Sequence, residues 1–208
     1  MKRAESLRIG VLASGRGSNL QAIIDAIEAG RLDSRLVVVV SDREGSQALE
    51  RARRHAVEGV VVDPKAYPDR EAFDRAVLAV LTERRAELVC LAGYMRILTP
   101  AFIRAMPGRI MNIHPALLPA FPGLHAQRRA VEGGVKISGA TVHFVDEGVD
   151  TGPIICQAAV PVREGDTAEA LAGRILEKEH ELYPQAIRLF IEGRLSIRGR
   201  RVLIREEP

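Results

Sequence analysis

The stretch LRIGVLASGRGSNL, residues 7–20, decides the fold of this chain. Its apolar run, Leu7 to Ala13, predicts a strand, and from Leu20 onward apolar residues recur at helical spacing until Gly30 ends the helix. Between the strand and the helix lies a glycine-rich turn. This arrangement points backbone N–H groups and a helix N-terminus toward one place, which is how α/β folds bind anions.

The turn leaves the kind of anion open. It supplies the first two glycines of the dinucleotide-binding motif G-x-G-x-x-G, and Asp42, after the second predicted strand, stands where a ribose-binding acid would. Leu20 replaces the third glycine, which disfavours close passage of a pyrophosphate. A single phosphate held by Gly17, Ser18 and Asn19 fits better. The alternative is a tight turn that binds no ligand.

Strand and helix patterns alternate through the first half of the chain. We expect strands at 36–40, 59–62 and 88–92 and helices at 45–55, 69–85 and 100–105. Beyond residue 110 the order changes. There we expect a strand to His114, a loop with three prolines, a helix at 125–132, strands at 136–145 and 154–162 around an acidic glycine loop, a helix at 168–191 kinked at Pro184, and a hairpin at 195–204.

These patterns predict an α/β fold with a Rossmann-like, open, mostly parallel sheet, helices on both faces and an antiparallel excursion in the C-terminal half. The strand at 88–92 is apolar throughout, which is typical of a parallel strand covered on both sides. We assign residues 1–208 to a single domain. Its N-terminal half covers about 7–110, its C-terminal half about 111–195, and a tail the residues 196–208.

The composition describes a globular protein and disfavours nucleic acid as a partner. Hydrophobic residues make up 47% of the chain, enough for a sizeable core, while the net charge of +3 is spread among interleaved acids with few aromatic rings. The apolar segment near the start is too short for a signal peptide or a membrane span. Cys90 and Cys156 lie in apolar runs, as buried thiols of a reducing compartment do, and the histidines lack metal-binding spacing. We therefore expect a cytoplasmic protein without a metal or membrane partner.

Asn112 and His114 are the strongest candidates for chemistry. They stand two residues apart at the end of a predicted strand, so their side chains project from the same face. The prolines that follow exclude helix and sheet, so both polar groups sit on the last rigid residues before an irregular loop, where α/β proteins keep their active sites. The alternative is a polar strand end that merely caps loop backbone.

A carboxylate from the loop at 146–150 would complete the site. A neutral imidazole can take a proton from an amine or water and return it to a leaving group, and an amide N–H can stabilise an oxyanion. A nearby carboxylate stabilises the imidazolium and raises the pKa of the histidine. The chain shows no nucleophile motif. The site thus predicts direct acyl transfer to an amine, or hydrolysis, with the acyl donor left open.

Several motifs resemble those of the phosphoribosylglycinamide formyltransferase family. They are SGRGSNL at 14–20, GYMRIL at 93–98, NIHP at 112–115, LLP at 117–119, FPG at 121–123, GATVHFVDEGVDTG at 139–152, EH at 179–180 and YP at 183–184. The resemblance runs from about Leu7 to Leu195, in the family's order. It implies 10-formyltetrahydrofolate and glycinamide ribonucleotide as the small-molecule substrates, no metal, and a monomer or weak homodimer.

The resemblance also assigns roles. Asn112 would polarise the formyl carbonyl and hold the oxyanion, His114 would be the general acid/base, and Asp150 would raise the pKa of His114. In the N-terminal half, the ribonucleotide phosphate would bind to Gly17, Ser18 and Asn19. In the C-terminal, folate-binding and catalytic half, Glu179 would bind the glycinamide or ribose end.

For the folate, the resemblance implies a pterin pocket built from two loops together with Asn112. The residues of these loops are Met95, Arg96, Ile97 and Leu98 in one, and Asp146, Glu147, Gly148, Val149 and Asp150 in the other. Arg70 matches the position that pairs with the glutamate tail of the folate; the alternative is an exposed helix residue. His143 either supports the site or is a hydrogen-bonded structural histidine. The peptide bond before Pro119 is either cis or trans.

Three rival functions stay open. Formyltetrahydrofolate hydrolases resemble this family around N-x-H but carry an additional N-terminal domain, and methionyl-tRNA formyltransferases carry an additional C-terminal one. We expect neither here, because the chain begins at its first strand and leaves no length for a further domain. A non-catalytic nucleotide-binding module would leave Asn112, His114 and Asp150 without a role, and tight dinucleotide binding would favour it.

Overall fold

The computed structural model describes residues 6–206, so both ends of the predicted range 1–208 lie outside the described part. The chain forms two compact units that divide between Met111 and Asn112. This division falls within strand β5 (Ile110–His114), which carries the chain from the first unit into the second. The two units are described separately below.

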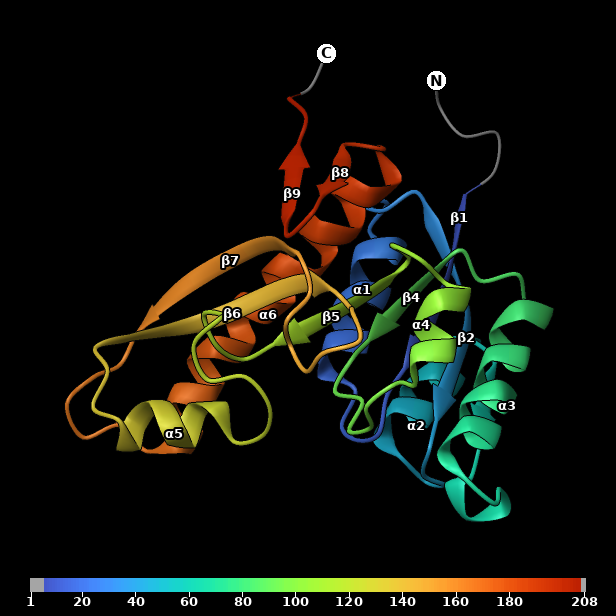
Figure 1. The fold of residues 1–208 in the computed structure, drawn as a ribbon, viewed down its shortest axis with the longest axis horizontal. Coiled ribbons are helices and arrows are strands. Elements are labelled where there is room, and N and C mark those ends of the chain that lie inside the picture. Colours follow the sequence, from blue (N-terminus) through green and yellow to red (C-terminus); the bar gives the residue numbers. More distant parts are fainter. Residues whose placement is uncertain (1–5, 207–208) are drawn as a thin grey trace. The chain divides into compact units, whose positions relative to one another are not determined.

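The first unit is built on parallel strands in the order β3-β2-β1-β4 (Figure 1). The strands are β1 (Leu7–Leu12), β2 (Ser34–Ser41), β3 (Gly59–Val61) and β4 (Leu88–Leu91). Leu12 pairs with Val40 on one side and with Leu91 on the other, so β1 and β4 end side by side. All four residues of β4 are buried, as its apolar sequence predicts.

Helices connect these strands and place the loops at their ends. They are α1 (Ser18–Glu28), α2 (Gln47–Arg54), the 3₁₀ turn η1 (Pro64–Ala66), α3 (Arg70–Glu83) and α4 (Pro100–Ala105). Helix α1 contacts α2, and α3 contacts α4. The chain moves from β1 outward to β2 and β3, and then returns to β4 on the other side of β1. With right-handed connections, the pair α1 and α2 therefore lies on one face of the sheet and the pair α3 and α4 on the other. The Asp69 side chain caps α3 at Ala72 N, as its sequence predicts.

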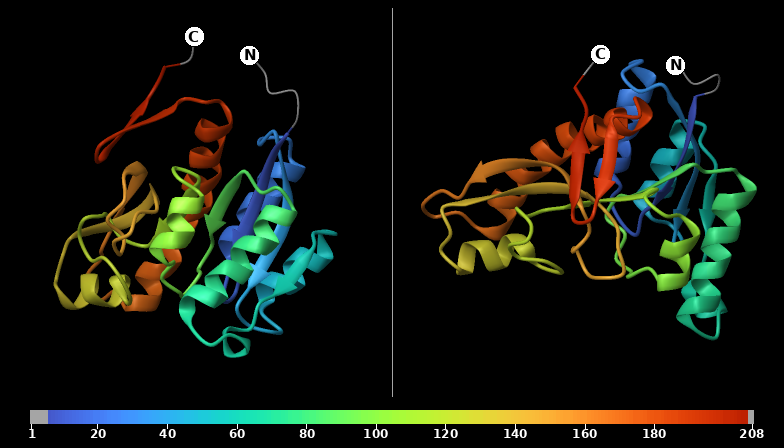
Figure 2. Two further views of the ribbon diagram at one scale, coloured as in Figure 1. Left: turned by 45° about the vertical axis from the view of Figure 1, so that its right-hand side comes forward. Right: turned by 45° about the horizontal axis from the view of Figure 1, so that its top comes forward.

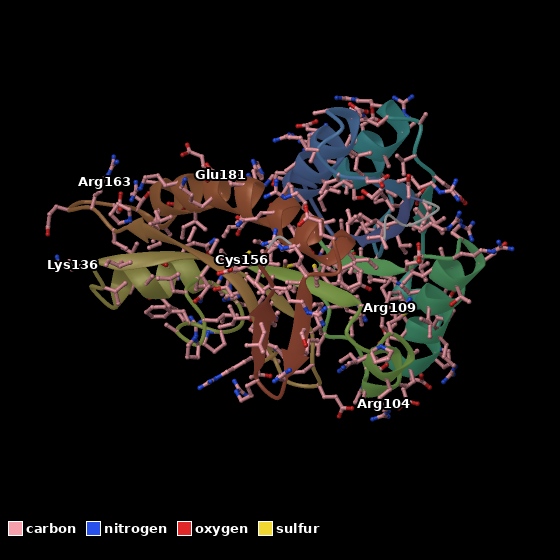
Figure 3. The ribbon with its side chains drawn as sticks, turned by 90° about the horizontal axis from the view of Figure 1, so that it is seen from above. Arg104, Arg109, Lys136, Cys156, Arg163 and Glu181 are labelled. Atoms are coloured by element: carbon pink, nitrogen blue, oxygen red, sulfur yellow. The ribbon has the colours of Figure 1, made fainter. Side chains whose placement is uncertain are left out.

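The second unit is a hairpin of long strands covered by the longest helix (Figure 2). Its elements after β5 are α5 (Ala126–Glu132), β6 (Ile137–Phe144), β7 (Ile154–Pro161), α6 (Ala168–Ile191), β8 (Leu195–Arg198) and β9 (Arg201–Ile204). Strands β6 and β7 are antiparallel, with Ile137 paired to Pro161, and α6 packs on both. Figure 3 accordingly shows Lys136 and Arg163 at the same end of this strand pair.

Every predicted strand and helix is present, with ends displaced by at most two residues. Helix α1 begins at Ser18, before the first apolar position of the pattern, because Gly17 takes the left-handed conformation (φ +68°) and ends the turn there. Helix α6 runs through Pro184 without interruption, capped by Thr167. The excursion from β6 to β7 is antiparallel as expected, and β9 joins β7 in parallel at Ile154 and Arg201.

Candidate active site

Strand β5 holds His114 in the interior of the second unit, where its side chain is 6% exposed. The loop that follows is tied to the β6–β7 pair. Thr141 Oγ1 donates to the Ala116 carbonyl (2.6 Å) and accepts from Leu118 N (3.1 Å), while Gln157 Nε2 donates to the Leu118 carbonyl (2.9 Å). The Leu118–Pro119 peptide bond is cis. The proline-rich loop is therefore a fixed part of the site.

The imidazole of His114 lies between two hydrogen-bond acceptors. Its Nε2 is 2.9 Å from the Phe121 carbonyl oxygen, and its Nδ1 is 3.2 Å from Oδ2 of Asp150. Both oxygens only accept, so the imidazolium donates from both nitrogens; in the neutral ring the one hydrogen stays on Nε2, at the shorter of the two contacts. A proton that the ring takes up therefore enters at Nδ1, beside the carboxylate.

Asp150 accepts two hydrogen bonds and lies beside a second imidazole. Its Oδ2 accepts a bond from Gly123 N (2.7 Å), its Oδ1 accepts one from Asn112 Nδ2 (3.3 Å), and Oδ1 lies 3.5 Å from His143 Nε2. Its backbone is left-handed (φ +54°), a conformation that aspartate tolerates better than most residues. The structure thus brings Asn112, His114 and Asp150 together in one unit.

Asp146 does not join this cluster. Its Oδ1 accepts bonds from Gly148 N (3.1 Å) and from Thr151 Oγ1 (2.6 Å), so this carboxylate closes its own loop. Glu147, Gly148 and Val149 are exposed along the loop. Asp150, at the end of this loop, faces the imidazole of His114.

Burial lowers the pKa of His114, and the net shift is downward although the Asp150 carboxylate and the hydrogen bond to Phe121 both raise it. The Asp150 carboxylate thus raises this pKa in the expected direction, but desolvation of the imidazolium outweighs its effect. For Asp150, burial alone would raise the pKa. The neighbouring imidazole of His143, the Gly123 N–H and the imidazole of His114 together bring it below its ordinary value.

His143, at the end of β6, orients the amide of Asn112. Its Nδ1 lies 2.8 Å from the Phe144 carbonyl oxygen and donates to it, so Nε2 of the neutral ring is an acceptor. Asn112 Nδ2 lies 3.2 Å from that Nε2. The two amide hydrogens of Asn112 thus point to His143 and to Asp150, which settles which end of the amide is nitrogen.

The glycine-rich turn that is expected to bind phosphate belongs to the first unit. Gly17 is the N-cap of α1 without a side-chain cap, and the first turn of α1 has no acidic residue, so nothing there competes with an anion. A Cβ on Gly17 would lie 2.8 Å from Ala48 Cα, which explains the glycine. Asn19 is buried, and Ser18 is half-buried. The geometry is that of an anion site at a helix N-terminus.

The loop after β4 lies against this turn. Ser14 N donates to the Gly93 carbonyl (3.2 Å), and Ser14 Oγ accepts from Met95 N (3.0 Å). Met95 and Ile97 are 60% and 54% exposed, which is unusual for such apolar side chains and leaves them available to a flat apolar ligand. Leu98, in contrast, is buried.

Two arginines of the first unit are already engaged. Arg96 stacks on the ring of Phe73, with its guanidinium carbon 4.7 Å from the ring centre. Arg70 is exposed at the start of α3 and donates from Nη2 to the Leu98 carbonyl (3.0 Å). Glu179, in the second unit, is a buried acid on α6, 6% exposed.

Sequence reasoning did not find the Phe121 carbonyl, the Gly123 N–H, or the supports Thr141 and Gln157. The first two are backbone groups and leave no mark on residue type. The signal for His143 was present, because its position on the strand puts it on the same face as Thr141.

A glycine-rich turn after the first strand of one unit, and an Asn–His–Asp cluster in the other, are the arrangement expected of an α/β enzyme of acid–base acyl chemistry. The model of the formyl transferase family matches residues 7–187. The chain belongs to the formyl transferase family, which confirms the family recognised from its motifs.

Relatives of known name agree. Phosphoribosylglycinamide formyltransferase of Escherichia coli (strain K12) is 43% identical over 191 residues, 92% of this chain and 90% of that protein. The trifunctional purine biosynthetic protein adenosine-3 of Drosophila pseudoobscura pseudoobscura is 50% identical over 190 residues. That match covers 90% of this chain, which spans only 14% of the length of that protein.

Solved structures confirm the α/β fold class. Glycinamide ribonucleotide transformylase 1 from Symbiobacterium toebii has a TM-score of 0.97 at 59% identity, covering 98% of this chain and 96% of that one. A formyltetrahydrofolate deformylase from Pseudomonas syringae has a TM-score of 0.89 at 29% identity, covering 98% of this chain and 67% of that one. Within residues 6–206, no helix is both long and apolar enough to cross a membrane.

Proposed function

We propose that this chain transfers the formyl group of 10-formyltetrahydrofolate to the amine of glycinamide ribonucleotide, giving formylglycinamide ribonucleotide and tetrahydrofolate in purine biosynthesis. The observation that carries the proposal is the Asn112–His114–Asp150 cluster, in which amide, imidazole and carboxylate lie within 3.3 Å of their partners. The names of the relatives above support the choice of substrates.

The reaction is a direct transfer. The amine nitrogen attacks the formyl carbon, a carbon–nitrogen bond forms, and the carbonyl electrons move to oxygen to give a tetrahedral intermediate. Collapse of this intermediate re-forms the carbonyl and breaks the bond to N10 of the folate. The amine loses one proton and N10 gains one, so no net proton is consumed.

His114 moves this proton. Its neutral ring accepts at Nδ1, where Oδ2 of Asp150 at 3.2 Å stabilises the imidazolium until the proton is returned. Burial keeps the pKa of His114 low, so the ring is neutral and ready to accept near pH 7. The Phe121 carbonyl holds the opposite nitrogen and keeps the ring in this orientation.

Asn112 stabilises the oxyanion. Its amide nitrogen lies 3.3 Å from Asp150 Oδ1 and 3.2 Å from His143 Nε2. In this proposal the formyl oxygen replaces Asp150 Oδ1 as the acceptor of one amide hydrogen. The hydrogen bond to His143 keeps the amide oriented. A preorganised donor of this kind contributes about a hundredfold or more to the rate.

The remaining residues bind the substrates. Gly17, Ser18 and Asn19 hold the phosphate, and Glu179 binds the glycinamide or ribose end of the ribonucleotide. The pterin contacts Met95 to Leu98 and Asp146 to Asp150, and Arg70 pairs with the glutamate tail after leaving the Leu98 carbonyl. A single domain, a cytoplasmic location, the absence of a metal, and a monomer or weak homodimer stay predictions.

The test is formyl transfer from 10-formyltetrahydrofolate, followed by absorbance, with and without glycinamide ribonucleotide. Turnover that depends strictly on the ribonucleotide is the expected result. Tetrahydrofolate release without the ribonucleotide would instead identify a hydrolase, the activity that the name of the Pseudomonas syringae relative states. If folded protein gives neither signal, the transferase and the hydrolase functions are both contradicted.

A further inference from the structure

We infer that Arg51, on α2, is a positioning residue for the phosphate-binding turn. Two donors of α2, about one helical turn apart, hold the turn by its carbonyl oxygens. Ala48 N donates to the Gly15 carbonyl at 3.1 Å, and Arg51 Nε donates to the Arg16 carbonyl at 2.9 Å. Helix α2 thus supports the turn from one side through these two hydrogen bonds.

The direction of these two bonds decides where the turn presents its donors. In a trans peptide the carbonyl oxygen of one residue and the N–H of the next point in opposite directions. Because the Arg16 carbonyl points at Arg51, the N–H of Gly17 points away from α2. The N–H of Arg16 points away as well, because the Gly15 carbonyl faces Ala48. An anion on the open side therefore meets donors.

The turn and α2 are in close contact at Gly17 and Ala48. Gly17 sits with its Cα hydrogens against Ala48, and a Cβ there would approach Ala48 Cα to 2.8 Å. The Gly17 carbonyl accepts from Gln21 N at 3.0 Å, which starts the hydrogen-bond pattern of α1. A small shift of the Arg16 peptide would consequently move the first N–H groups of α1.

Arg51 is itself fixed by a second bond. Its Nη1 donates to Gln21 Oε1 at 3.0 Å, and Gln21 Nε2 donates to Asp25 Oδ1 at 2.8 Å. The planar guanidinium thus bridges the turn to α1, a geometry that a lysine ammonium, as a single point of charge, does not reproduce. The role follows from geometry and not from charge alone.

Arg53 offers a matched control on the same helix. Its Nε and Nη2 donate to Glu50 at 2.9 and 2.8 Å, and its side chain is 74% exposed. Replacing Arg53 removes the same charge two residues away and leaves the turn untouched.

This inference rests on the proposed function, because it assumes that the turn binds the ribonucleotide phosphate. The experiment measures binding of ribose 5-phosphate by calorimetry and the KM values for both substrates, in R51M, R51K and R53M. We expect R51M and R51K to bind ribose 5-phosphate about tenfold more weakly, a loss of about 1.4 kcal/mol. The KM for glycinamide ribonucleotide should rise in parallel, while the KM for the folate and kcat at saturation stay within about twofold.

Three results would overturn the inference. They are wild-type affinity in R51M, wild-type affinity in R51K, which would assign the effect to charge, and an equal loss in R53M. Failure of the proposed function looks different, since the wild type would then bind ribose 5-phosphate without ribonucleotide-dependent turnover. A wild type that does not bind ribose 5-phosphate would contradict both.

Discussion

The side-chain amide of Asn112 donates to Nε2 of His143 over 3.2 Å, and this bond fixes the amide because the other ring nitrogen of His143 is taken by the Phe144 carbonyl at 2.8 Å. His143 is 2% exposed and has no freedom to turn over. The ring therefore selects the orientation in which Asn112 presents N–H groups, and not its oxygen, to the rest of the site.

Replacing His143 should consequently reduce turnover without weakening substrate binding. In His143→Phe the Asn112 amide loses the acceptor that orients it, and we expect kcat to fall by about tenfold to a hundredfold, with both KM values within about twofold. His143→Gln keeps an acceptor and should retain more of the activity. Equal kcat values for His143→Phe and the wild type, in folded protein, would remove His143 from this role.

Loss of His114 should abolish most turnover and spare the phosphate site. His114→Ala removes the group assigned to proton transfer, so we expect kcat to fall by about a hundredfold to ten-thousandfold. The phosphate-binding turn is built from residues 14–19 and supported by α2, so the Kd of ribose 5-phosphate should not change. Single-turnover kinetics and calorimetry measure the two effects separately. Turnover at the wild-type rate would rule out the proposed mechanism.

Asp150→Asn should lower the pKa of His114 further. Burial lowers this pKa, and the carboxylate is the foremost influence that raises it, so its loss leaves burial less opposed. Below the pKa the ring is protonated and accepts no proton, so activity falls on the acid side. The acid limb of kcat should therefore move to lower pH while the plateau drops.

The matched control for this prediction is Asp146→Asn. It removes the same charge from the same loop, and an asparagine oxygen can still accept from Gly148 N and Thr151 Oγ1. NMR titration of the His114 ring should therefore show a clear downward shift in Asp150→Asn and little change in Asp146→Asn. The same shift in both variants would mean that long-range charge, and not the contact at 3.2 Å, sets this pKa.

Patterns of residue type were sufficient for the elements of the fold. Helix α6 follows the predicted range 168–191, because Thr167 provides the cap and apolar residues recur at helical spacing to Ile191. Cys90 is buried as its apolar neighbours predicted, whereas Cys156, predicted to be buried on the same grounds, is only half-buried. The partial burial of Cys156 still raises the pKa of its thiol to about 12. Figure 3 labels it on β7, where its Sγ lies 3.8 Å from the Leu182 carbonyl of α6.

The parts of the site that the sequence did not reveal are backbone groups. The carbonyl of Phe121 and the N–H of Gly123 reach His114 and Asp150 only because Phe121 takes a left-handed conformation (φ +55°), for which a phenylalanine gives no signal. The balance between burial and charge at His114 likewise depends on packing, since a sequence names the neighbouring carboxylate but not how much water is excluded.

Gly152 and Gly173 test how tightly the loop that carries Asp150 is anchored. A Cβ on Gly152 would lie 1.8 Å from the Phe144 carbonyl oxygen, and because that atom is backbone, the strand end itself would have to move. We expect Gly152→Ala to reduce the free energy of unfolding by about 2 kcal/mol or more. It should also lower kcat, because Asp150 stands two residues away.

Gly173 provides the control. It lies on the exposed side of α6 and has nothing within 4 Å of its added Cβ, so Gly173→Ala should stabilise the protein by about 1 kcal/mol through helix propensity. Urea unfolding of both variants measures the contrast. A Gly152→Ala protein as stable and active as the wild type would show that the end of β6 yields to the loop, and that Asp150 does not depend on this anchor.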